Sequence, residues 1–126
     1  MAAPNIVNVT TITGKTVTTT LANTSQTPLL TNAASSGKVF KINMIQVSNI
    51  DGTSAADITV DINFLDGGGG SASTTRLVST ISVPADAALV VVDKNTAFYL
   101  EEDTRINGTA GTGGDLSVTI SYEEIS

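Results

Sequence analysis

The 126-residue sequence contains no cysteine and no histidine. The chain therefore forms no disulfide and lacks the ligands of the usual zinc sites. The same absence removes the most frequent general base and the most reactive nucleophile of enzymes. We expect no cofactor and no catalytic residue, and the sequence predicts a protein that is not an enzyme.

Tryptophan is also absent, and the aromatic residues, three Phe and two Tyr, make up 4% of the chain. The core is therefore expected to be aliphatic and thin. A glycosidase needs two carboxylates facing each other across a cleft lined by sugar-stacking aromatic rings, which this composition makes hard to build. We therefore expect the clustered acids to be solvated surface residues. These acids are Glu101, Glu102 and Asp103, together with Glu123 and Glu124.

The EF-hand pattern is absent, because "DGTSAAD" (51–57) lacks its alternating acidic ligands. A surface Ca²⁺ site made by loops that follow different strands remains an open alternative. Its candidate ligands are Asp51, Asp57 and the acids 101–103.

Basic residues are scarce: six stand against 12 acidic residues, for a formal net charge of −6. Binding to nucleic acid or to an anionic membrane calls for a basic patch, so neither partner is expected. No apolar run approaches the ~20 residues of a membrane helix. The start, "MAAPNIVNVTTITGKT", has no basic segment followed by a continuous apolar stretch, so no signal peptide is expected.

What the chain has in abundance is β-branched residues, including 20 threonines. Such residues suit pleated strands. Alternation of apolar and polar residues predicts strands with one buried face at 57–64 and 115–123, and apolar residues that share one face predict another at 75–83. The expected inward residues are Ile58, Val60, Ile62 and Phe64, then Leu77, Ile81 and Val83, then Leu116, Val118, Ile120 and Tyr122. The first strand turns Asp57, Thr59, Asp61 and Asn63 to the other face.

The stretch "DGGGGSAST" (66–74) has the composition of a flexible linker, but it lies between two of these strands. A phosphate-binding loop would need a following helix, and a strand follows here. Two halves of roughly 60 residues without disulfides or metals would each be marginally stable. The stretch is therefore interpreted as a hairpin loop within one domain.

Further strands and turns follow from local patterns. In 38–50 the apolar parity changes midway, which predicts a bulged or bent strand. The run 89–92 is apolar on both parities, as in a central strand, and 97–103 reads as a short strand. Turns are expected at 49–57, 106–115 and Thr13-Gly14-Lys15, the last between two weak strands.

Eight or nine short strands without a convincing helix predict a single antiparallel β-sandwich, with jelly-roll topology favoured. The whole chain, 1–126, is expected to form this one domain. Residues 1–14 are either an edge strand or an N-terminal arm. Residues 3–12 are apolar on both parities, so an arm could add as a strand to a neighbouring subunit. The expected assembly contacts are then Ile6, Val7, Val9 and Ile12.

Three passages, 36–62, 81–106 and 114–126, carry a resemblance to a known family. Their motifs are Val83-Pro84-Ala85, Tyr99-Leu100-Glu101-Glu102 with Asp103, and Ser121-Tyr122-Glu123-Glu124-Ile125. With "APNIVNVTTITGKT" at the start, the chain resembles small β-sandwich virion structural proteins of tailed bacteriophages, notably those of marine cyanobacteria. One departure is "EEDTRING", where the usual form has a Gly before the Asp.

The resemblance implies a component of the virion and carries over no enzymatic residue. The expected function is a capsid decoration (cement) protein, which binds other virion proteins, above all the major capsid protein. A neck, tail or fibre component, or a receptor- or carbohydrate-binding jelly-roll module, is the alternative. A small core and exposed sheet edges favour a homo-oligomer. By analogy with decoration proteins generally, we expect a trimer.

Overall fold

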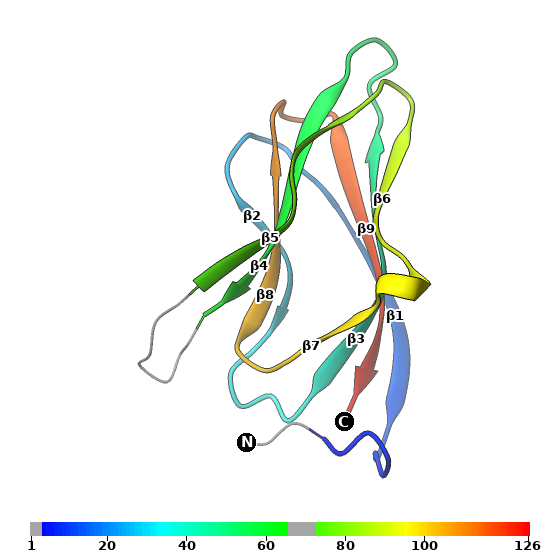
Figure 1. The fold of residues 1–126 in the computed structure, drawn as a ribbon, viewed down its shortest axis with the longest axis vertical. Coiled ribbons are helices and arrows are strands. Elements are labelled where there is room, and N and C mark those ends of the chain that lie inside the picture. The colour runs from blue at the N-terminus through cyan, green and yellow to red at the C-terminus, as the bar shows by residue number, and fades with distance from the viewer. Residues whose placement is uncertain (1–3, 66–72) are drawn as a thin grey trace.

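A computed structural model describes residues 4–65 and 73–126. These residues form nine strands and one short 3₁₀ helix, η1 (Lys94–Thr96) (Figure 1). The strands are β1 (Ile12–Thr20), β2 (Thr27–Asn32), β3 (Val39–Asn49), β4 (Ala56–Phe64), β5 (Ser73–Val83), β6 (Ala88–Val92), β7 (Phe98–Leu100), β8 (Thr104–Ala110) and β9 (Leu116–Ile125).

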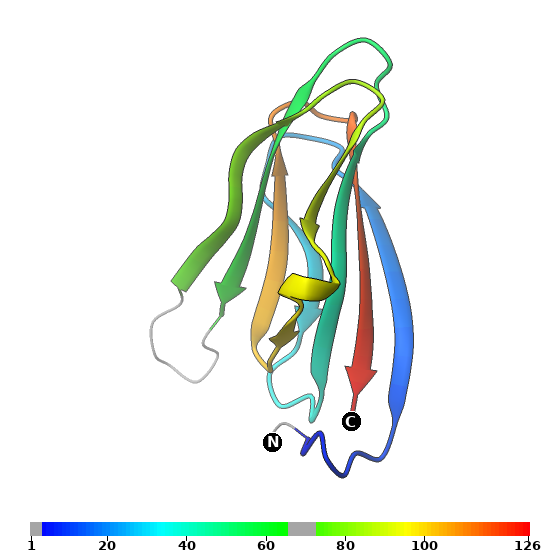
Figure 2. The same cartoon turned by 45° about the vertical axis from the view of Figure 1, so that its right-hand side comes forward.

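The strands form two antiparallel sheets that face each other as two layers (Figure 2). One has the order β1-β9-β3-β6, with β7 also paired to β3, and the other has the order β2-β8-β4-β5. β6 pairs with 45–48 of β3 and β7 with 40–42, so the two are successive pieces of one edge strand. Counted this way, the chain changes sheet after every strand except between β4 and β5. This is the order of a jelly roll, and the predicted β-sandwich is confirmed.

The core lies between the layers and is mainly aliphatic. β9 shows why the sequence predicts it well: Leu116, Val118, Ile120 and Tyr122 alternate inward and are all buried. β3 confirms the predicted change of parity, because its register against β9 shifts between Ile42 and Met44. The extra residue turns Phe40 and Ile42 inward before the shift, and Ile45 and Val47 after it.

The glycine-rich stretch joins β4 to β5, which pair as an antiparallel hairpin from Phe64 opposite Ser73 to Ala56 opposite Val83. The loop itself, 66–72, lies outside the described residues. On β4, Ile58 and Val60 are fully buried as predicted, whereas Phe64 at the open end is 42% exposed.

Asp61 departs from the predicted solvent-facing side of β4, because it is buried. Its carboxylate accepts hydrogen bonds from Asn107 Nδ2 at 3.1 Å and from Gln26 Nε2 at 3.2 and 3.3 Å. The neighbouring strand and the β1–β2 connection therefore cover this position, and alternation along one strand cannot reveal such a cover.

Ile81 was expected to share a buried face with Leu77 and Val83. Val83 is fully buried, but Ile81 is 40% exposed. β5 is an edge strand whose register shifts twice against β4, and Thr80, next to Ile81, has a φ of 53°. These irregularities break the simple alternation on which the expectation depended.

The expectation of a central strand at 89–92 is wrong. β6 is an edge strand beside β3, and Val90 is 55% exposed. An apolar run shows that both faces of a strand can be buried. Whether they are buried depends on where long-range pairing places the strand in the sheet.

The turn predicted at 106–115 is also wrong in its first half, because 106–110 belong to β8. Gly108 lies in this strand for packing: a Cβ there would approach Leu29 Cδ1 to 3.0 Å and Leu21 Cδ1 to 3.5 Å. The turn at Thr13-Gly14-Lys15 does not form, since β1 continues through Gly14, which pairs with Glu123. Residues 4–11 are not a strand.

Candidate functional site

A groove of about 400 Å³ opens between the two sheets, on the side where β5 and β7 form the edges. Figures 1 and 2 show the ends of β4 and β5 next to the glycine-rich stretch diverging from the other sheet. The groove is lined by Ile62, Phe64, Leu77, Thr96, Phe98, Tyr99, Leu100, Glu101 and Thr104.

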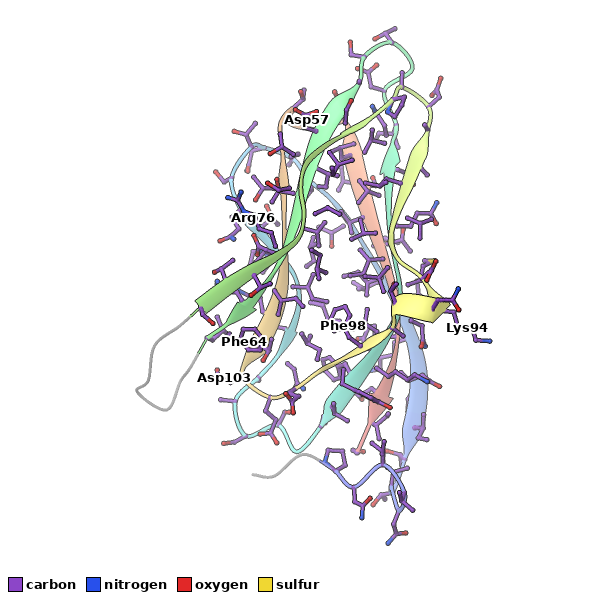
Figure 3. The ribbon with its side chains drawn as sticks, viewed as in Figure 1. Asp57, Phe64, Arg76, Lys94, Phe98 and Asp103 are labelled. Carbon is purple, nitrogen blue, oxygen red and sulfur yellow. The ribbon has the colours of Figure 1, made fainter. Side chains whose placement is uncertain are left out.

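Three of the five aromatic residues of the chain line this groove. Phe64 comes from β4, whereas Phe98 comes from β7 on the opposite sheet (Figure 3). Tyr99 follows Phe98 on β7. Phe64 is 42% exposed and Tyr99 is 47% exposed. The other two aromatics, Phe40 and Tyr122, pack in the core with ring centroids 5.1 Å apart. The sequence shows how few aromatics there are, but not that folding gathers most of the exposed ones in one place.

The polar groups of the groove are the hydroxyls of Thr96 and Thr104 and the carboxylate of Glu101. Glu101 is the single acid among the lining residues, whereas hydrolysis of a glycosidic bond needs two opposed carboxylates. An apolar floor with exposed rings and a few polar groups suits the binding of a ligand.

A smaller hollow of about 190 Å³ adjoins the groove, because Tyr99 and Glu101 line both. Its remaining lining residues are Pro4, Ile6 and Val39. The N-terminal segment, residues 4–11, thus borders one end of the groove that Phe64, Phe98 and Tyr99 line, called the aromatic groove below.

The residues expected to make assembly contacts lie in and just after this N-terminal segment. Ile6, Val7 and Ile12 are 52%, 91% and 56% exposed, and Val9 is half-buried. Ile12 begins β1, and the other three precede it. The four side chains do not form one buried cluster, and their role in assembly remains a prediction.

The main chain just before β1 is bound to the other end of the protein. The N–H groups of Thr10 and Thr11 donate to the Ser126 carbonyl at 2.7 and 3.0 Å, and Ser126 N–H donates to the Thr11 carbonyl at 3.0 Å. The segment is therefore fixed at its end next to β1.

The candidate calcium ligands are not brought together. Asp51 closes the β3–β4 turn, where its Oδ1 accepts from the N–H and from the hydroxyl of Thr53, both at 2.9 Å. These hydrogen bonds, the backbone one first, lower the pKa of Asp51. Within residues 4–65 and 73–126, no group of three or more His, Cys, Asp or Glu side chains could hold a metal ion.

The acids near the C-terminus are more engaged than a solvated surface implies. Glu124 Oε1 lies 3.3 Å from Lys15 Nζ and 3.4 Å from Lys38 Nζ, and Glu123 Oε2 lies 3.9 Å from Lys41 Nζ. The Glu124 side chain is 19% exposed. These pairs tie β1, β9 and the start of β3 together, although each partly exposed pair adds little stability by itself.

Ser35 and Lys38 have the Ser-x-x-Lys spacing of serine–lysine nucleophiles. Here the Lys38 ammonium is paired with Glu124, and Ser35 is exposed in the β2–β3 turn with a φ of 58°. The recorded partner of the Lys38 ammonium is thus a carboxylate on β9, and the spacing alone is no evidence of a serine–lysine pair.

In the part of the chain that the structure describes, no helix is long and apolar enough to cross a membrane.

Comparisons with known proteins found likeness in structure alone. No family model and no curated protein matches the chain. Similar solved structures include the CBM22-1-GH10 modules of Clostridium thermocellum endo-1,4-beta-D-xylanase 10B complexed with xylohexaose, at 12% identity and a TM-score of 0.43. Bacillus endospore appendages, described as disulfide-linked pili, reach 16% identity and a TM-score of 0.46. Infectious bursal disease virus, Gx strain, reaches 12% identity and a TM-score of 0.49.

These matches cover 84%, 92% and 93% of this chain, respectively. The chain spans 20% of the CBM22-1-GH10 chain and 32% of the virus chain, but 88% of the appendage chain. At such identities and scores the likeness carries no inference about function.

Proposed function

We propose that the protein is a non-enzymatic structural component of a tailed-phage virion and that it decorates the capsid. The observation that carries this proposal is the place of the motifs that resemble phage virion proteins. Two of them lie on either side of β3. Phe40 pairs with Leu100 on one side and with Glu124 on the other, and Lys41 likewise pairs with Tyr99 and Glu123.

The residues of these motifs build the fold. Val83, Leu100, Tyr122 and Ile125 are buried in or beside the core. The Ala87 N–H donates to the Pro84 carbonyl at 3.1 Å and closes the turn before β6. The resemblance therefore extends to residues that determine how the strands pair, which supports a shared architecture and a structural role.

The proposal is tested on purified particles. Mass spectrometry of virions should detect the protein at a copy number per particle proportional to that of the major capsid protein. An electron-microscopy map should place it on the outer capsid surface. Absence from the particle would overturn the virion role. Density confined to the neck, tail or fibres, with a correspondingly low copy number, would overturn the decoration role and keep the structural one.

The aromatic groove favours a second candidate function, the binding of a carbohydrate receptor. The exposed rings of Phe64 and Tyr99, which come from different sheets, could stack on sugar rings, and Thr96, Thr104 and Glu101 could bind hydroxyl groups.

A glycan array tests this second candidate. We expect a bound glycan to be lost in the variants Tyr99→Ala and Phe64→Ala and retained in the matched control Val90→Ala. Val90 is 55% exposed and is not among the groove-lining residues. No binding to any glycan, or equal binding by all three variants, would exclude the groove as a carbohydrate site.

A further inference from the structure

The two sheets have four edges, and three of them are interrupted. β2 contains Pro28 and a register shift between Pro28 and Leu30. β5 has two register shifts and a left-handed residue, Thr80. At the edge of the larger sheet beside β3, η1 separates the edge strand into two short pieces, β6 and β7. Prolines, bulges and short edge strands are devices that prevent a sheet edge from pairing with another chain.

The remaining edge, β1, has none of these devices. All nine of its residues pair with β9 without a register shift. Its sequence, ITGKTVTTT, contains no proline and is rich in the β-branched residues that favour strands. Among the described residues, β9 is its single neighbour, and Figure 1 shows β1 at the outer side of its sheet.

Hydrogen bonds at both ends of β1 determine which residues face outward. Thr11 and Ser126 exchange two main-chain hydrogen bonds, and the Leu21 N–H donates to the Leu116 carbonyl at 2.9 Å. Bonded and non-bonded pairs alternate along an antiparallel ladder, so the odd-numbered residues bond to β9. The even-numbered residues direct both N–H and C=O away from β9. They are Ile12, Gly14, Thr16, Thr18 and Thr20.

The charge distribution permits two such edges to meet. All 12 acidic residues of this negatively charged chain lie at position 51 or later. The one charged residue of β1 is Lys15, whose ammonium lies 3.3 Å from Glu124 of its own chain. Two copies that approach through β1 therefore place no carboxylate of one strand against a carboxylate of the other.

We propose that β1 pairs antiparallel with β1 of a second copy, about a two-fold axis at Thr16. This register overlaps all nine residues, with Thr16 opposite itself and Thr18 opposite Gly14, so that outward N–H and C=O groups meet. Lys15 then lies opposite Val17. A register centred on Lys15 would place two like charges directly opposite each other, which is unfavourable.

The proposed β1–β1 pairing joins the larger sheets of the two copies into one continuous sheet. The assembly is a two-fold dimer, unlike the trimer expected by analogy with decoration proteins. It rests on the proposed function in one respect: a subunit that assembles needs an interface between copies. The pairing is tested on purified protein and the proposed function on particles, so either can fail alone.

Because the chain has no cysteine, a single introduced thiol tests the register. In a directly bonded antiparallel pair the Cα atoms lie about 5.5 Å apart, within the range of a disulfide. We expect Thr16→Cys to form a covalent dimer under mild oxidation. In the control Thr20→Cys the two thiols are eight residues apart along the pair, about 27 Å at ~3.4 Å per residue, and should not cross-link. Equal cross-linking of the two variants, or none, would overturn the register.

A proline variant tests the edge without an introduced bond. Thr18→Pro removes an outward N–H that β9 does not use, so the inner ladder is retained. We expect wild-type protein and the control Thr18→Val to have the mass of a dimer in light scattering, and Thr18→Pro to have the mass of a monomer with an unchanged β-type circular dichroism spectrum. A dimer or trimer that Thr18→Pro leaves intact would overturn the proposal. If Thr18→Pro fails to fold, the cysteine pair alone decides.

Discussion

Within residues 4–65 and 73–126, four non-glycine residues adopt the left-handed backbone region: Ser35, Thr80, Asp86 and Asp103. Aspartate tolerates this region, whereas a β-branched residue does so at a cost of about 1–2 kcal/mol. Thr80, with a φ of 53°, is thus the most strained of the four. Its N–H donates to Thr59 Oγ1 at 2.9 Å, a bond that keeps the bulge of β5 in place and does not need the threonine side chain.

We expect Thr80→Gly to raise the free energy of unfolding by about 0.5–1 kcal/mol, because the relief of strain exceeds the added entropy of the unfolded chain. Urea denaturation measures the change. The control Thr75→Gly, in the same strand, should lower stability, since Thr75 is not in the left-handed region. A lower urea midpoint for Thr80→Gly would show that its side chain stabilises the bulge.

Gly113 is required by close packing in the β8–β9 turn. A Cβ at this position would lie 2.7 Å from the Ala22 carbonyl oxygen and 3.1 Å from Asn23 Cα, and both are main-chain atoms. We expect Gly113→Ala to cost about 1–3 kcal/mol, as overpacking does. Gly14→Ala is the matched control, because a Cβ at Gly14 meets nothing within 4 Å. Thermal unfolding compares the two, and equal melting temperatures would contradict the packing argument.

At the scale of the elements, prediction from the sequence succeeded where one face of a strand is buried. Alternation along β9 and the change of parity in β3 are imposed by the core itself. Prediction from the sequence failed where the burial of a residue depends on which strands pair with its own. The apolar run of β6 does not show that, among the described strands, only β3 lies beside it. Gly108 resembles a turn residue in the sequence, and only the fold shows that Leu29 packs against it.

The groove could not be predicted for the same reason. Phe64 and Tyr99 are far apart in the sequence and lie on different sheets, and the order of the strands brings them to one opening. Local sequence patterns contain no information about which distant residues come to lie together at this opening.

The glycine-rich stretch yields a prediction for the β4–β5 hairpin. If residues 67–70 serve as a connection between paired strands, replacing them with Asn-Gly should leave the fold intact. Loop length changes stability by only about 0.6 kcal/mol per doubling. Thermal unfolding and light scattering measure the outcome. A collapse of the melting temperature, or a changed oligomeric mass, would show that the stretch makes contacts of its own.

At the scale of the whole molecule, the N-terminal segment can be separated from the sandwich. Its main-chain bonds to Ser126 begin at Thr10. We expect a chain lacking residues 1–9 to keep its melting temperature within about 3 °C, since surface segments contribute little stability. If Ile6, Val7 and Val9 are assembly contacts, this chain should bind particles more weakly than the full chain.

A deeper deletion is the control for this experiment. Removing residues 1–14 also takes away Ile12 and Gly14, which pair with β9, and should lower the melting temperature. If the chain lacking residues 1–9 binds particles at the wild-type level, the N-terminal residues are not assembly contacts.

The central position of β9 has a consequence for biosynthesis. Of the nine strands that the structure describes, this one is synthesised last, yet it lies between β1 and β3 and pairs with both. The roughly 95 residues between β1 and β9 take about 5–20 s to translate. Throughout that interval the nascent chain carries β1 with both edges open. The larger sheet closes only after β9 has been synthesised, so a chain terminated before β9 cannot assemble it.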